Sequence, residues 1–161
     1  MKLVLTFAGL LAVVVLPALA QTPNTTVLRA PSVDAKPAVT YIDHDNVAAA
    51  LAKGGSLVTA ANLTVSGNHR MGPGQVEVHD LETDIFYVVE GTATIVTGGT
   101  MVGGKQTAPG QHRGTDVQGG ETRRLQKGDV MVIPAGIPHW FKEVSPTINY
   151  LTVKVIKQSG I

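Results

Sequence analysis

The chain of 161 residues contains no cysteine. That absence excludes disulfide scaffolds, cysteine-ligated zinc sites, iron–sulfur centres and thiol nucleophiles. Charge is also scarce, since charged residues make up 16% of the chain and the formal net charge is +1. A nearly neutral chain lacks the basic footprint of a nucleic-acid-binding domain, so no nucleic-acid partner is expected. The sequence also lacks a G-x-S-x-G elbow, a P-loop, an H-E-x-x-H motif and a G-x-G-x-x-G motif, and so the enzyme classes that depend on them are not indicated.

Long apolar runs are absent except at the N-terminus, where residues 3–16 follow a lysine and carry no charge. Residues 17–20 then place small side chains in an A-x-A pattern. This order is typical of a secretory signal peptide over residues 1–20, with cleavage near Ala20/Gln21. The run is shorter than the ~20 residues of a spanning helix, so stable membrane insertion is not expected. The sequence therefore predicts a secreted or periplasmic protein.

Eighteen glycines and nine prolines are present. They indicate many turns and favour an all-β fold of short strands, and the length fits one domain. Three prolines fall within residues 21–40, which are predicted to form an extended arm before a domain over residues 41–161. A short helix is predicted over residues 43–53, with Asp43 as its N-cap and a Gly-Gly pair as its stop.

From residue 56 onward the hydrophobic pattern has a period of two, which predicts strands. They are expected at residues 57–65, 76–79, 84–89, 92–97, 122–125, 130–133, 140–144 and 148–156. Residues 67–74 are predicted as a turn-rich connection. The glycine-rich residues 98–120 are predicted as one long loop, a kind of segment that often has a function, for example as a lid.

Two histidines lie at predicted strands with acidic neighbours. Glu77 and His79 are two residues apart and therefore share one face of a strand. Asp84 begins the next strand, and His139 follows a proline- and glycine-containing turn. If the sheet closes into a small barrel, these four groups could surround one point. Imidazole and carboxylate donors suit Fe, Mn, Zn, Cu or Ni better than Ca or Mg, although the spacing alone is equally compatible with ordinary half-buried polar side chains.

Two motifs resemble those of the cupin superfamily. The second cupin motif is matched closely by Gly128-x5-Pro134-x-Gly136-x2-His139. A variant of the first motif is present as Glu77-x-His79-x4-Asp84-x6-Gly91. The resemblance covers residues 56–156 and implies an antiparallel jelly-roll β-barrel of a small single-domain cupin, with its motifs at residues 77–91 and 128–143.

The resemblance also implies a divalent transition metal site, with departures from the usual pattern. Cupin sites typically use three histidines and one glutamate. By motif position, Glu77 replaces the first histidine, His79 and His139 are retained, and Asp84 replaces the glutamate with a shorter side chain. Such a set resembles a two-histidine, carboxylate iron centre with open positions. The altered ligands leave three outcomes open: weaker binding, a different metal or loss of the metal.

Further residues near the motifs are candidates for a ligand pocket. Those expected to line its wall or rim are Arg70, Phe86, Val88, Phe141 and Glu143, the last of which stands where cupins often have asparagine. Arg70, predicted in a loop, could contact an anionic ligand, and His112 could supply a third imidazole or carry a proton if residues 98–120 cover the site. For each of them the alternative is ordinary core packing or a solvated side chain.

Three functions remain open from the sequence. One is a secreted metal-dependent cupin enzyme acting on a small organic molecule, since cupins include dioxygenases, isomerases, decarboxylases and lyases. The second is a cupin that binds a small molecule without catalysis or metal, and the third is a purely structural barrel. In each case a homodimer is expected, because cupins commonly pair and C2 dimers are the commonest closed assembly.

Overall fold

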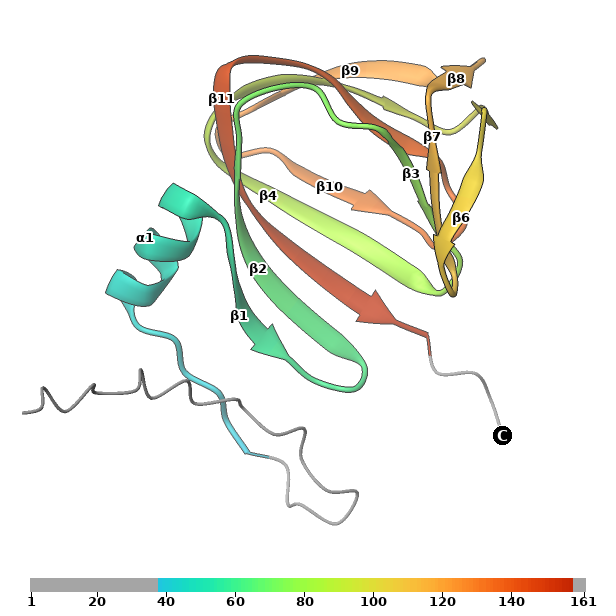
Figure 1. Cartoon of the computed structure of the whole chain (residues 1–161). Coiled ribbons are helices and arrows are strands. Elements are labelled where there is room, and N and C mark those ends of the chain that lie inside the picture. Colours follow the sequence, from blue (N-terminus) through green and yellow to red (C-terminus); the bar gives the residue numbers. More distant parts are fainter. Residues whose placement is uncertain (1–37, 158–161) are drawn as a thin grey trace, which may run out of the picture.

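The computed structural model describes residues 38–157 (Figure 1). The predicted signal peptide and residues 21–37 of the predicted arm lie outside the described residues. Residues 38–40 of the arm are irregular and exposed. Among the described residues, no helix is long and apolar enough to cross a membrane.

The described part of the chain folds as antiparallel β-structure with one short helix, which confirms the predicted fold class. The elements are α1 (His44–Lys53), β1 (Gly55–Thr59), β2 (Leu63–Arg70), β3 (Val76–His79), β4 (Glu82–Thr97), β5 (Thr100–Val102), β6 (Lys105–Ala108), β7 (Gln111–Gly114), β8 (Asp116–Gln118), β9 (Glu121–Gln126), β10 (Val130–Ile133) and β11 (His139–Ile156).

The predicted helix is confirmed as α1. Its N-cap is Asp43, whose carboxylate accepts a hydrogen bond from the Asn46 amide at 2.9 Å. The buried Ala50 faces β2. The helix approaches that strand at Gly67, where a Cβ atom would lie 2.6 Å from the Ala50 carbonyl carbon and 2.8 Å from the Leu51 nitrogen. A side chain at this position would therefore push the helix away from the sheet.

We expect Gly67→Ala to lower the free energy of unfolding by roughly 1–3 kcal/mol, since the obstructing atoms are backbone and α1 must shift as a unit. Urea denaturation followed by circular dichroism measures this loss. Gly72→Ala is the matched control, because a Cβ atom there would meet nothing within 4 Å. Equal stability of the two variants would contradict this account of the helix contact.

The sheet is organised around its two longest strands, β4 and β11, which pair with each other along most of their length. Strand β11 also pairs with β2 and β3, and β4 also pairs with β9 and β10. Figure 1 shows these strands curling around a common interior. Each long strand joins two of the predicted shorter ones. The β4 ladder continues through a bend at Gly91, which adopts a φ of 83° that favours glycine.

The interior is filled by alternate residues of the long strands. Ile95 and Ile148 are fully buried, and the aromatic rings of Phe86, Phe141 and Tyr150 pack against one another with centroids 5.1–5.6 Å apart. Burial of this apolar surface is the main source of stability for the fold. The same face of β11 and β4 continues into a polar region described below.

Two predictions about irregular segments are wrong. Residues 98–120 form strands β5 to β8 rather than one loop, because glycines with positive φ, such as Gly98, Gly103, Gly110 and Gly119, make tight turns between short strands. Strand β7 then pairs with β3. Similarly, β2 extends to Arg70, so residues 67–70 belong to a strand, and the predicted strand 57–65 is a hairpin of β1 and β2.

Candidate metal centre

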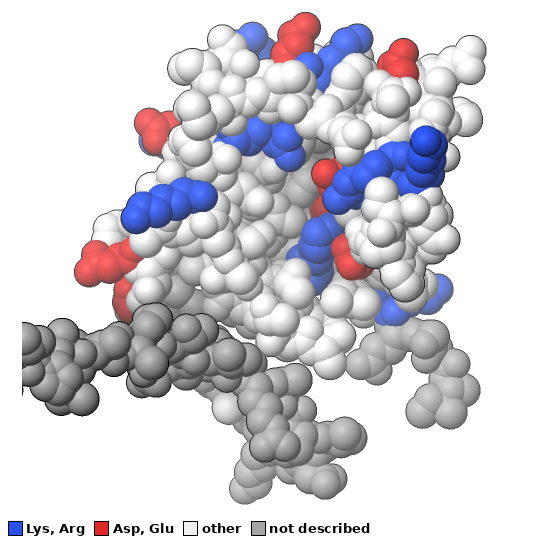
Figure 2. Space-filling model, in the orientation of Figure 1, with Lys and Arg blue, Asp and Glu red and all other residues white. Residues whose placement is uncertain are grey.

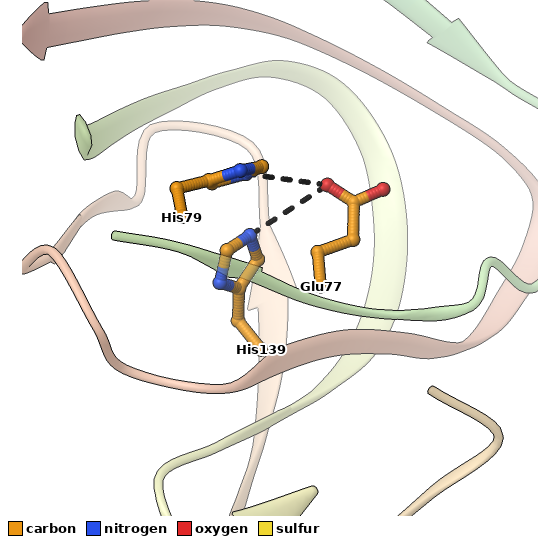
Figure 3. A group of neighbouring side chains, drawn as sticks. All are labelled: Glu77, His79 and His139. Atoms are coloured by element: carbon orange, nitrogen blue, oxygen red, sulfur yellow. Dashed lines mark ion pairs between the residues drawn. The ribbon is translucent and has the colours of Figure 1, made fainter. Parts of the chain in front are cut away.

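The four motif residues gather at one end of the interior. Glu77 and His79 lie on β3, Asp84 lies on β4, and His139 begins β11. The β3–β11 register pairs His139 directly with Glu77, which explains how residues 62 positions apart become neighbours. Figure 3 shows the side chains of Glu77 and His79 from β3 and of His139 from β11 pointing toward one another.

The donor atoms converge. The Nε2 atom of His79 lies 3.5 Å from Glu77 Oε2 and 3.5 Å from Asp84 Oδ2. The Nε2 atom of His139 lies 3.8 Å and 3.6 Å from the same two oxygens. Ligand atoms of Glu77, His79 and His139 lie within 4.8 Å of one another. One ion between these atoms would therefore be within reach of two nitrogens and two oxygens.

Both imidazole rings are oriented through their other nitrogen. His139 Nδ1 lies 3.1 Å from the carbonyl oxygen of Ile137, and His79 Nδ1 lies 2.5 Å from the amide oxygen of Gln111. Since both partners accept, each Nδ1 donates. This leaves Nε2 as the free coordinating atom, which is how metal-binding histidines are usually held. Both Nε2 atoms are buried and have no hydrogen-bond partner among the described residues.

Each carboxylate also divides its two oxygens between the centre and a cation. Asp84 Oδ1 accepts a hydrogen bond from Lys154 Nζ at 2.7 Å, while Oδ2 faces the imidazoles. Glu77 Oε1 lies 3.6 Å from Arg113, while Oε2 faces the imidazoles. The shorter side chain of Asp84 therefore does reach the cluster, because β4 brings its backbone close.

The two imidazoles differ in their protonation. Burial alone would lower the pKa of His79, but the carboxylates of Asp84 and Glu77, each with an oxygen 3.5 Å from His79 Nε2, outweigh burial and raise that pKa to about 9. Burial dominates at His139 and lowers its pKa. The carboxyl pKa values of Glu77 and Asp84 stay below their usual values despite burial, because both groups face His79 and each also lies beside a further cation, Arg113 or Lys154. Without a metal the cluster thus holds its proton on His79.

A polar cavity of about 160 Å³ opens beside the cluster. It is lined by Ser66, Asn68, Arg70, Gln75, Glu77, Asp84, Phe86, His139, Phe141, Tyr150, Thr152 and Lys154. Figure 2 shows acidic and basic side chains side by side at a hollow on this face of the molecule. The cavity combines an aromatic wall with hydrogen-bonding and charged groups, as small-molecule sites do.

The residues predicted to line a ligand pocket lie in three different places. Arg70, Phe86 and Phe141 line the cavity, whereas Val88 is buried in the apolar core. Glu143 lies on the exposed surface, where it accepts a hydrogen bond from Thr94, because the strand is irregular between Phe141 and Glu143.

His112 is also placed away from the cluster. It pairs with Val78 across the β3–β7 ladder and therefore points to the opposite face from Glu77 and His79. Its Nε2 instead contacts the Asp80 carboxylate at 3.0–3.1 Å, in an exposed position.

Four residues of the site were missed in the sequence, among them Glu82, which forms a second possible ligand group with His79 and Asp84. Gln111 and Arg113 flank His112 and face the cluster from β7. Lys154 continues the inward stripe of Ile148, Tyr150 and Thr152 along β11. The period-two pattern could have identified Lys154, whereas Gln111 and Arg113 required knowing that β7 is a strand.

The comparisons with known proteins agree with this architecture. A family model described as Cupin matches residues 36–158. Similar solved structures include a cupin protein from Bacteroides fragilis, with 21% identity over 63% of this chain and 71% of that chain and a TM-score of 0.43. A protein from Bacillus halodurans has 16% identity over 65% of this chain and 70% of that chain, with a TM-score of 0.47. KdgF from Halomonas sp. has 19% identity over 65% of this chain and 79% of that chain, also with a TM-score of 0.47.

No match was found among the curated proteins. The solved structures are similar to this chain in fold alone. The family model, by contrast, covers most of the chain and includes both motifs recognised in the sequence. This chain belongs to the cupin family.

Proposed function

We propose that the protein binds a divalent transition metal through His79, His139, Glu77 and Asp84, and holds a small organic molecule beside it in the cavity. The observation that carries this proposal is the pair of buried Nε2 atoms without a hydrogen-bond partner. Leaving such polar atoms unpaired is costly, so a native protein is expected to supply a partner for them. The described residues place only carboxylate oxygens 3.5–3.8 Å from these nitrogens, too far for a hydrogen bond of good geometry, and a metal ion between them would supply the partner.

The donor set also favours a particular class of ion. Two imidazole nitrogens and two carboxylate oxygens suit Fe, Mn, Zn, Cu or Ni. A bound ion of this kind supplies Lewis-acid polarisation of a ligand oxygen, or lowers the pKa of a water molecule. The chemistry available to such a centre includes oxygenase, isomerase and lyase reactions.

The surrounding residues have defined tasks in this proposal. Gln111 holds His79 in the coordinating orientation, and Lys154 fixes Asp84 through Oδ1. The aromatic wall of Phe86, Phe141 and Tyr150 limits access of water to one side of the cavity. These groups keep the coordinating atoms in place before a ligand arrives, which reduces the cost of binding.

A second function is supported by the ligand set itself. Glutamate replaces one of the usual histidines, and Lys154 occupies one oxygen of Asp84. The lysine competes with a metal for the charge of Asp84, and the altered ligand set departs from the usual one, which favours a cupin that binds a small molecule without a metal or catalysis. The same cavity would then hold the ligand by its polar and aromatic side chains alone.

Elemental analysis of the mature protein purified without chelator separates the two functions. The proposed function predicts close to one transition-metal ion per chain, removed by dialysis against a strong chelator and restored by adding the metal alone. A preparation that contains no transition metal and takes up none would favour the metal-free binding protein.

Metal binding at pH 7 is expected to release about one proton per ion. In the metal-free protein His79 is protonated, because its pKa of about 9 lies above the solution pH, and its Nε2 must lose that proton to coordinate. The apparent affinity should therefore rise with pH up to about 9. Calorimetric titration in two buffers with different ionisation enthalpies measures the release, and a binding enthalpy independent of the buffer would contradict this prediction.

The place of action and the assembly belong to the same proposal. We infer from the signal-peptide pattern in residues 1–20 that the protein works outside the cytoplasm, as a secreted or periplasmic protein. We also infer a homodimer, on the symmetry argument given for the sequence.

A further inference from the structure

Arg70 occupies an unusual position in the cavity. It lies at the end of β2 among the lining residues, and its guanidinium carbon sits 4.8 Å from the centre of the Phe141 ring. This places the positive charge of Arg70 over the face of the Phe141 ring, a cation–π contact. The Nε atom of Arg70 is buried and has no hydrogen-bond partner among the described residues.

The other cations near the cluster are already paired. Lys154 contacts both Asp84 and Glu82, and Arg113 contacts Glu77. None of the ion pairs in the described part of the chain involves Arg70. The cavity therefore contains one guanidinium whose charge no carboxylate of the described residues balances directly. A half-buried cation without a carboxylate partner leaves a place for an anionic ligand.

The backbone beside Arg70 makes room for its guanidinium. A Cβ atom on Gly74 would lie 2.7 Å from Arg70 Nη1. Gly74 is itself fixed on both sides, because its amide donates to the Phe141 carbonyl at 2.9 Å and its carbonyl accepts from Trp140 Nε1 at 2.7 Å. Since Gly74 is held in place, a side chain at this position would force the guanidinium of Arg70 to move.

The wall next to Arg70 indicates what kind of anion it would hold. Phe86, Phe141 and Tyr150 form an aromatic surface on the same cavity. An inorganic anion would gain nothing from that surface, whereas the carbon body of an organic acid would lose apolar area from water against it. The planar N–H pairs of arginine also match the two oxygens of a carboxylate.

We propose that Arg70 is the recognition residue for the carboxylate of a small organic acid, which lies along the aromatic wall between Arg70 and the metal centre. This inference rests on the proposed function only for the part of the ligand that faces the metal. It adds a substrate class, small organic carboxylates, and one residue that selects it.

The test compares carboxylates with neutral amides of the same shape. The probes are acetate, glycolate, lactate and malonate, their amides, and inorganic phosphate at equal ionic strength. Thermal shift and calorimetry are run on metal-loaded and chelator-treated mature protein. At least one carboxylate is expected to stabilise the wild-type protein more than its amide and more than phosphate. Arg70→Met is expected to weaken that binding at least about 10-fold, because it removes a charged bidentate contact.

Two further variants control for misfolding of Arg70→Met and for a general effect of removing an arginine. Gly74→Ala keeps the arginine but displaces its guanidinium, so it should also weaken carboxylate binding, even if Arg70→Met folds poorly. Arg124→Met removes an exposed arginine on β9 and should bind carboxylates like wild type. Equal binding of carboxylates and amides throughout the panel, a preference for phosphate, or unchanged carboxylate binding in Arg70→Met and Gly74→Ala would overturn the inference.

The outcomes also separate this inference from the proposed function. If the protein takes up no metal but prefers carboxylates through Arg70, the metal proposal fails and the carboxylate site stands. If the metal binds and Arg70→Met leaves carboxylate binding unchanged, the carboxylate site fails and the metal proposal stands.

Discussion

His79→Ala and His139→Ala are each expected to abolish metal retention, with affinity reduced by at least about 100-fold. The two imidazoles are the only nitrogen donors of the cluster among the described residues, and both are already oriented by hydrogen bonds from Nδ1. Losing residues that merely orient a ligand commonly costs 10–100-fold in metal affinity, so losing a ligand itself should cost at least as much. Elemental analysis and calorimetric titration of the purified variants measure the effect.

The carboxylates should give a graded result. Glu77→Ala is expected to weaken binding strongly, since Glu77 Oε2 faces both imidazoles. Asp84→Ala should weaken it less, because Asp84 already shares its charge with Lys154. Asp84→Glu is a useful companion, since it restores the glutamate typical of cupins at this motif position.

Two histidines outside the cluster serve as controls. His112→Ala should leave metal content unchanged, because His112 points to the opposite face of the β3–β7 ladder and contacts Asp80. His69→Ala should do the same, since the ring of His69 lies beside Asn149 and not at the cluster. Equal metal content in wild type, His79→Ala and His139→Ala would show that any bound ion is adventitious.

Two local features of the sequence predicted which residues form the cluster. Alternation along a strand put Glu77 and His79 on one face, and the turn ending at His139 positioned the start of the last strand. The register of β3 with β11 then aligned His139 with Glu77. That register is a long-range feature that no local pattern contains. Only the resemblance to the cupin motifs therefore predicted that the four side chains converge.

The supporting residues were harder to predict for a different physical reason. The glycines between residues 98 and 120 resemble those of a loop, yet they form turns between short strands that pair with their neighbours. Because β7 is not recognisable as a strand in the sequence, the sequence indicates His112 as the candidate of this segment. Its neighbours Gln111 and Arg113 make the contacts to the cluster instead. The sequence predicts Arg70 in a loop, whereas it ends strand β2, because polar residues that face a cavity resemble loop residues in the sequence.

Lys154 makes the strongest charged contacts of the centre. Its ammonium group lies 2.7 Å from Asp84 Oδ1 and 2.9 Å from Glu82 Oε2. Asp84 is only 3% exposed, whereas the side chain of Lys154 is 26% exposed. Removing the lysine therefore leaves a buried carboxylate without its closest cation, which is far more costly than losing an exposed ion pair.

We expect Lys154→Met to lower the free energy of unfolding of the metal-free protein by roughly 3 kcal/mol, the magnitude typical of breaking a buried pair from one side. A bound divalent ion returns positive charge next to Asp84, so the loss should be smaller in the metal-loaded protein. By linkage, a smaller loss in the loaded state means that the variant binds the metal more tightly than wild type does. Denaturation with and without metal, together with calorimetric titration, measures both quantities.

Arg123→Met is the matched control for Lys154→Met. Arg123 pairs with Glu121 on β9, but their side chains are 47% and 66% exposed. An exposed ion pair contributes little, so this variant should change stability by less than about 0.5 kcal/mol and leave metal affinity unaltered. If Lys154→Met instead loses the same stability with and without metal, its charge is not coupled to the ion. Asp84 would then lie outside the coordination sphere, and the centre would consist of Glu77, His79 and His139.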